Sequence, residues 1–167
     1  MNLEVSTSTT SRRLGVGWNL ALACDLIVAT EDASFSAPVV QRGLVPDGGA
    51  AWFLMRALGR PRAAELLLLG DRLTARSAAG LGLVNRLTPA GAALTEAIEL
   101  AGGLARGAPD ALVLTKTLLG AAMDSTFERY LETEWLSAAP DLLGPDAAEG
   151  RAAFVEKRPP DFRRGHL

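Results

Sequence analysis

The segment from Gly15 to Thr30 constrains the fold more than any other part of the 167-residue chain. A glycine turn, GVG, leads into WNLALACD, in which Leu20, Ala23 and Cys24 share one helical face. The apolar run LIVAT follows at once and predicts a buried strand. A helix that passes directly into a buried strand indicates an α/β fold.

The next part of the chain alternates strand and helix signals. ASFSAP predicts a short strand and VPDGG predicts a turn, because proline and glycine oppose regular structure. A helix is expected from Ala50 to Leu58, ended by Gly59, with another beginning near Pro61. Thr74 can cap a short helix, and LGLVNRL predicts a further strand.

The chain divides into three parts by residue composition and hydrophobic periodicity. Residues 1–13 are rich in Ser and Thr without periodicity, which predicts an irregular N-terminal arm. Residues 14–105 combine strands with helices, and residues 106–167 are helical. Within the last part, Asp146 followed by Glu149 has the pattern of a capping box at a helix start.

Composition excludes several classes of protein. The formal net charge is -2, and the basic residues form no electrostatic footprint for nucleic acid. The first residues resemble no signal peptide, and no apolar run reaches the roughly 18 residues that a membrane span needs. The single cysteine, Cys24, cannot form an internal disulfide, so we expect a cytoplasmic protein that does not bind membranes.

Nucleophilic and metal chemistry also lack their usual residues. The single histidine, His166, stands next to the last residue, so a Ser-His or Cys-His pair has no base. With one cysteine and one terminal histidine, no metal site is expected. The glycines of GVG are not followed by the spacing of a dinucleotide or P-loop site.

The start of the first helix can stabilise negative charge. Backbone N–H groups at Gly15, Val16 and Gly17 have no helical acceptor, and such groups can hold an oxygen on which charge develops. The alternative is that the glycines only make a tight turn before the helix. These three residues alone leave both interpretations open.

The chain resembles the enoyl-CoA hydratase/isomerase (crotonase) family through GVGWNLALACDLIVATEDASFSAPVVQRGLVPDGG and the terminal EGRAAFVEKRPPDF. The resemblance runs from about Leu14 to Arg163. It implies the C-terminal half of a spiral of ββα turns, followed by a helical trimerisation region. It also implies an acyl-CoA substrate, no separate cofactor, and a thioester enolate held by two backbone N–H groups, the second of them at Val16.

The residues that match the family's acid/base positions are unusual. The two glutamates of its hydratases correspond here to Asn19 and Val39, and neither side chain can transfer a proton. Asp47 matches an aspartate that moves protons in dienoyl-CoA isomerases and in the ring-epoxide isomerases of phenylacetate degradation. GVGWNLALACD with GLVPDGG is most similar to the second of these subgroups, so isomerisation is favoured over hydration.

Each remaining site residue has a structural alternative. Asp47 can cap the helix that begins near Gly49, or it can act on protons if an apolar pocket surrounds it. Trp18, Val39 and Trp52 can form such walls, although tryptophan at helical spacing also suits a core. Lys157 matches a position that reaches the phosphates of CoA, commonly across a subunit boundary, and can equally be a solvated lysine.

The resemblance places the family's first half before Leu14, where this sequence has thirteen residues. We therefore expect several strands and the first oxyanion N–H group to be missing. Three functions follow as alternatives: an acyl-CoA isomerase, an enoyl-CoA hydratase, and a non-catalytic remnant that binds acyl-CoA or forms oligomers. The expected assembly is a homotrimer or a hexamer.

Overall fold

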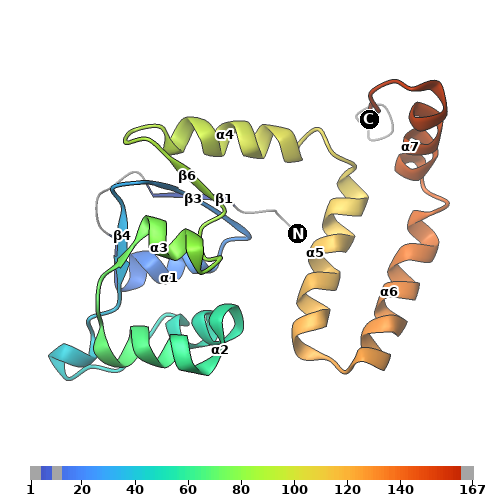
Figure 1. Cartoon of the computed structure of the whole chain (residues 1–167). Helices are drawn as coiled ribbons and strands as arrows, with labels where there is room; N and C mark the ends of the chain where they lie inside the picture. Colours follow the sequence, from blue (N-terminus) through green and yellow to red (C-terminus); the bar gives the residue numbers. More distant parts are fainter. Residues whose placement is uncertain (1–4, 9–12, 163–167) are drawn as a thin grey trace. The chain divides into compact units, whose positions relative to one another are not determined.

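A computed structural model describes residues 5–8 and 13–162 of the chain (Figure 1). The chain forms two compact units, and each is described by itself. The first, called here the sheet unit, ends at Leu100, and the second, the helical unit, begins at Ala101. The sequence places this boundary after residue 105.

The sheet unit contains short strands separated by helices. Its elements are β1 (Val5–Ser8), β2 (Arg13–Leu14), α1 (Val16–Leu22), β3 (Leu26–Thr30), β4 (Ser34–Ser36), the 3-10 helix η1 (Val40–Arg42), α2 (Ala50–Leu69), β5 (Leu73–Thr74), α3 (Ala75–Gly80), β6 (Arg86–Thr88) and the first part of α4 (Ala93–Leu104). The helical unit contains α5 (Pro109–Asp124), α6 (Phe127–Asp141) and α7 (Pro145–Glu156).

The strands form two small three-stranded sheets. One has the order β1-β3-β6 with parallel pairs, and the other has the order β2-β4-β5, in which β4 is parallel to β2 and antiparallel to β5. The first four strands alternate between the sheets, and α1 and α2 each follow one pair of them. The chain thus makes ββα turns, as the family resemblance implies.

Alternate residues of β3 face different helices. Ile27 and Ala29 belong to the main hydrophobic core, whereas Val28 packs with Ala93 and Ala97 of α4. Successive side chains of a strand point to opposite faces, so this sheet is covered on both sides, with α4 against one of them (Figure 1). LIVAT is therefore confirmed as a buried strand.

In two segments the observed secondary structure differs from the prediction. Val5–Ser8, inside the arm predicted to be irregular, form β1 and pair with β3. The edge of β3 supplies hydrogen-bond partners that the sequence does not reveal. Residues 1–4 and 9–12 of the arm lie outside the described residues. In LGLVNRL only the last two residues belong to a strand, β6. Leu83 and Val84 precede this strand and lie in the hydrophobic core.

The predicted break at Gly59 and the predicted cap at Thr74 are confirmed. Gly59 has φ 71° and ψ 171°, which kinks α2 just before Pro61. A residue without a Cβ adopts this backbone conformation far more readily than any other. Thr74 caps α3, since its hydroxyl oxygen accepts a hydrogen bond from the Ser77 N–H at 3.1 Å.

The capping box predicted at Asp146 and Glu149 is wrong. Asp146 lies inside α7 and is buried, and its carboxylate accepts a hydrogen bond from the Asp110 N–H at the start of α5. Glu149 instead pairs with Arg158 and accepts from the Asp161 N–H at 2.7 Å. Both carboxylates make tertiary contacts in place of a local cap.

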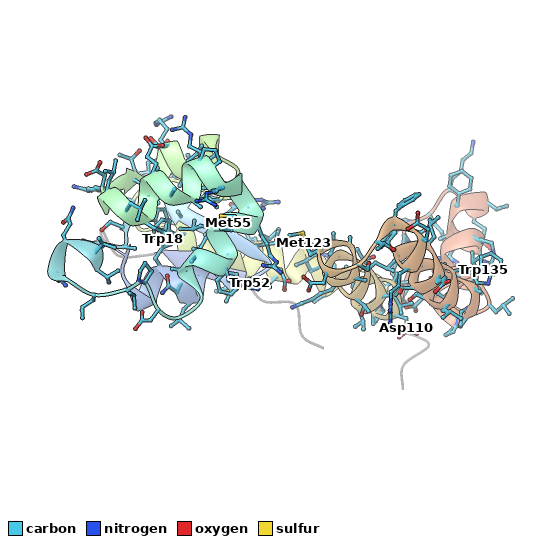
Figure 2. All side chains as sticks on the ribbon, turned by 90° about the horizontal axis from the view of Figure 1, so that it is seen from below. Trp18, Trp52, Met55, Asp110, Met123 and Trp135 are labelled. Atoms are coloured by element: carbon cyan, nitrogen blue, oxygen red, sulfur yellow. The ribbon has the colours of Figure 1, made fainter. Side chains whose placement is uncertain are left out.

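Apolar side chains of the helical unit are largely exposed. Within its described part, Ala153 is the buried hydrophobic residue, whereas large side chains on all three helices face outward. Trp135 is 73% exposed and points away from α6 (Figure 2). The other large, exposed apolar residues of this unit are Val113, Leu119, Met123, Phe127, Leu131, Leu136, Leu142, Leu143, Phe154 and Val155.

Candidate functional site

The glycine turn anchors the start of α1 to the neighbouring sheet. Gly15 has φ 55°, and its N–H donates to the Ser36 carbonyl of β4 at 3.0 Å. The Gly15 carbonyl accepts from the N–H groups of Trp18 and Asn19 at 3.0 and 3.3 Å. The N–H groups of Val16 and Gly17 belong to the first turn, where a helix provides no acceptor, so this end can hold an anionic oxygen.

Asn19 connects this helix to a distant turn. Its side chain is 4% exposed, and Nδ2 donates to the Asp47 carbonyl oxygen at 2.8 Å. The bond joins residues 28 positions apart, both of which the sequence identifies as site residues. The fold therefore brings the first turn of α1 next to the backbone of Asp47.

Asp47 does not cap the following helix with its side chain. Gly49 is the N-cap of α2 and no side chain caps it, whereas the Asp47 carbonyl accepts from the Ala50 N–H at 3.2 Å. The carboxylate of Asp47 is exposed. The capping alternative thus fails, and the apolar surroundings expected of a catalytic Asp47 are not formed by the described residues.

The two tryptophans proposed as pocket walls occupy different places. Trp18 is 2% exposed and packs in the core against Phe35, with ring centroids 5.9 Å apart. Trp52 is half exposed on α2, where Arg56 lies over its ring at 3.7 Å from the centroid. Figure 2 shows both tryptophans. Trp18 therefore follows the alternative of a core residue, because a ring packed on all sides cannot line an open pocket.

Val39 is the remaining candidate wall. Its side chain is half-buried at the N-cap of η1, and its carbonyl accepts from the N–H groups of Arg42 and Leu44 at 3.0 Å. The loop that carries it leads directly to Asp47. Val39 is thus an apolar residue on the approach to the turn.

Lys157 lies in the helical unit, at the end of α7. It is exposed and has φ 53°, a left-handed conformation that is uncommon for a residue with a side chain. The adjacent Arg158 is bound by Glu149 and Glu156, whose carboxylates raise its pKa above the ordinary range. Lys157 therefore presents an ammonium group beside a cation that is already paired.

The described part of the chain contains no group of three or more His, Cys, Asp and Glu side chains that could hold a metal ion. No helix in it is long and apolar enough to cross a membrane. His166 lies outside the described residues.

The sequence did not reveal how closely Gly48 approaches Asn19. Gly48 has φ 56°, and a Cβ at this position would lie 2.9 Å from Asn19 Nδ2. The dipeptide Gly48-Gly49 predicts a turn, but nothing in the sequence indicates that Asn19 lies against it. The structure thus brings the backbone of the turn that carries Asp47 beside the first turn of α1, whose N–H groups can hold an oxyanion.

Comparisons with known proteins show the family of the chain. Residues 12–165 match the family described as enoyl-CoA hydratase/isomerase. The chain is 36% identical over 150 residues to a 2,3-dehydroadipyl-CoA hydratase of Escherichia coli, which covers 90% of this chain and 59% of that protein. It is 37% identical over 158 residues to a mevalonyl-coenzyme A hydratase of Aspergillus fumigatus, covering 92% and 58%.

Solved structures give the same result. An enoyl-CoA hydratase from Polaromonas sp. JS666 superposes with a TM-score of 0.88 at 42% sequence identity, over 91% of this chain and 59% of that one. The chain belongs to the enoyl-CoA hydratase/isomerase family and has the crotonase fold of its C-terminal half. It spans less than two thirds of the length of these relatives.

Proposed function

We propose that the chain supports acyl-CoA isomerisation, with Asp47 transferring the proton. One observation carries this proposal: the Asn19 amide holds the Asp47 backbone at the first turn of α1, while Asn19 and Val39 lack titratable groups. Asp47 is therefore the carboxylate available among the three matching positions. Its exposed side chain, which does not cap α2, is free to meet a substrate.

Isomerisation of an enoyl thioester needs one base and N–H groups that stabilise the negative charge on the thioester oxygen. The Asp47 carboxylate removes a proton from C2 of a 3-enoyl thioester, and the electron pair of that C–H bond moves toward the thioester oxygen. The Val16 N–H holds this oxygen as negative charge develops. Return of the proton at C4 moves the double bond to C2–C3 and regenerates the carboxylate.

Hydration is the second candidate, because the similar proteins named above are called hydratases. Addition of water requires a base for the water and an acid for the α-carbon. Asn19 can bind water but cannot exchange its proton, and Val39 can do neither. A hydratase built on this chain would have to use Asp47 for both steps.

Incubation of the purified chain with two probes separates these functions. We expect slow conversion of 3-hexenoyl-CoA to its conjugated 2-isomer, because the first oxyanion N–H group is expected to be missing from this chain. The product is observed as a rise in the ultraviolet absorbance of the enoyl thioester. We expect crotonyl-CoA to be hydrated poorly or not at all. Brisk hydration would support the hydratase, and binding without turnover of either probe would support the non-catalytic acyl-CoA-binding alternative.

Further residues are proposed to bind the substrate. Val39 supplies an apolar contact near the turn, and the ammonium group of Lys157 binds phosphates of CoA. Lys157 belongs to the helical unit, which is also proposed to mediate self-association. Lys157 can therefore serve the site of another subunit.

We also propose that the helical unit mediates self-association, as a trimer or hexamer. Its three helices expose large apolar side chains, among them Trp135, Leu136 and Phe154, each more than 70% exposed. Apolar area of this kind is costly in water and is characteristic of a surface that another chain covers.

A further inference from the structure

The carbonyl oxygen of Asp47 is held from two directions. It accepts from the Ala50 N–H at 3.2 Å, which closes the turn into α2, and from Asn19 Nδ2 at 2.8 Å. The first bond is local, whereas the second comes from α1, 28 residues earlier. The second bond therefore fixes the turn relative to α1.

This turn has little conformational preference of its own. Gly48 and Gly49 follow Asp47 with φ values of 56° and 82°. Glycine adopts positive φ readily but has the largest backbone freedom to lose, so consecutive glycines leave the preceding residue weakly restrained. Asn19 supplies a restraint from outside the turn, and its amide fits against Gly48 so closely that a Cβ there would lie at 2.9 Å.

The second polar atom of the Asn19 amide indicates that the residue contributes little net stability. Its Oδ1 is buried and has no hydrogen-bond partner among the described residues. An unpaired buried acceptor is unfavourable, which offsets the gain from the bond made by Nδ2. An apolar side chain of the same size would avoid this penalty. The amide therefore affects the position of the turn more than the stability of the fold.

We propose that Asn19 is the positioning residue for Asp47, which it holds through the main chain. This inference rests on the proposed function of Asp47 and differs from a direct contact between Asn19 and substrate. Asp47 has an exposed carboxylate that does not cap α2, so its backbone decides where the carboxylate lies. Release of the turn should lower the rate of proton transfer and leave binding of the acyl-CoA nearly unchanged.

The substitution Asn19→Leu tests this with the full 167-residue chain. Leucine has nearly the same shape, removes the Nδ2 donor, and also removes the unpaired Oδ1, so the protein should stay folded. We expect kcat for 3-hexenoyl-CoA to fall by about tenfold or more while KM changes less than about twofold. Amide hydrogen exchange across residues 44–50 should become faster. Asn19→Ala, which also removes the donor and introduces no carboxyl group, is the second variant and should behave similarly.

The matched control is Asn85→Leu. Asn85 Oδ1 accepts from the Ile27 N–H at 2.7 Å, a bond of similar length in the same unit but away from the turn. This control should lose stability without slowing proton transfer or exchange at residues 44–50.

The background Asp47→Asn distinguishes positioning from a structural effect. In that background, Asn19→Leu should reduce residual turnover no further, because there is no proton carrier left to position. A further fall of the same size, normal turnover of both Asn19 variants, or unchanged exchange at residues 44–50 would overturn the positioning role. A parent that does not isomerise the probe, or that Asp47→Asn leaves fully active, would instead overturn the proposed function, and with it this inference.

Discussion

The side-chain amide nitrogen of Asn19 lies 2.8 Å from the main-chain carbonyl oxygen of Asp47. This contact links the helix start that can hold an oxyanion to the turn that carries the candidate proton-transfer residue. It also gives a role to an asparagine at a position where family hydratases have a catalytic glutamate. In the proposed mechanism, the backbone of Asp47 sets the position of the carboxylate that transfers the proton.

Asp47→Asn should reduce isomerisation of 3-hexenoyl-CoA by about 100-fold or more, because the amide cannot carry the proton. The melting temperature should change little, since the carboxylate does not cap α2. Initial rates and thermal unfolding measure the two effects. Asp71→Asn, another exposed aspartate in the sheet unit, is the control and should leave both unchanged. A variant that loses stability but keeps its rate would assign Asp47 a structural role.

Lys157→Asn should weaken binding of acyl-CoA by several-fold and make it less dependent on salt, because one contact to phosphate is lost. Asparagine tolerates the left-handed backbone at this position better than most residues, so the fold should be preserved. Calorimetry with an acyl-CoA and with the matching acyl-pantetheine, which lacks the nucleotide, is the measurement. Equal losses for both ligands would show that Lys157 does not contact phosphate.

Replacing Trp135 and Leu136 by glutamate should dissociate the assembled protein, since both side chains are more than 70% exposed on α6. Charges on a surface that another chain covers would have to lose water without a partner. Sedimentation velocity across a wide concentration range reports the change, with Glu132→Gln on the same helix as the control. A parent that stays monomeric throughout would contradict the proposed self-association.

Gly59→Ala should lower the free energy of unfolding by about 1–3 kcal/mol, because φ 71° with ψ 171° is nearly restricted to glycine. A Cβ there meets nothing within 4 Å, so the cost arises from the backbone alone. Gly80→Ala in α3 is the matched control, since its Cβ also meets open space but its φ is not positive. This control should raise stability by about 0.5–1 kcal/mol in urea titrations. Equal effects of the two substitutions would argue against the kink at Gly59.

Asp146→Ala should destabilise the helical unit by about 1–2 kcal/mol, because the Asp110 N–H at the start of α5 loses its buried acceptor. Urea unfolding followed by far-UV circular dichroism measures the loss. Glu132→Gln, an exposed acidic residue on α6, should have little effect. If Asp146→Ala unfolds at the parent's midpoint, the contact between α7 and α5 does not support the unit.

The sequence by itself determined those features that depend on local backbone chemistry. Glycine permits a positive φ that other residues avoid, and a threonine hydroxyl can accept a backbone hydrogen bond at a helix start, which is why the break at Gly59 and the cap at Thr74 were predicted correctly. The apolar run LIVAT likewise predicted a buried strand, and the structure covers that strand on both faces. The order of motifs was enough to predict the family.

Only the tertiary structure decided which side chains meet. Asp146 looked like a local cap and instead binds the start of α5, because burial against a neighbouring helix offers a better donor than its own helix does. Trp18 suited both a pocket wall and a core, and its packing on Phe35 places it in the core. The Asn19–Asp47 contact depends on how α1 packs beside the turn before α2, and spacing along the chain carries no information about a bond across 28 residues.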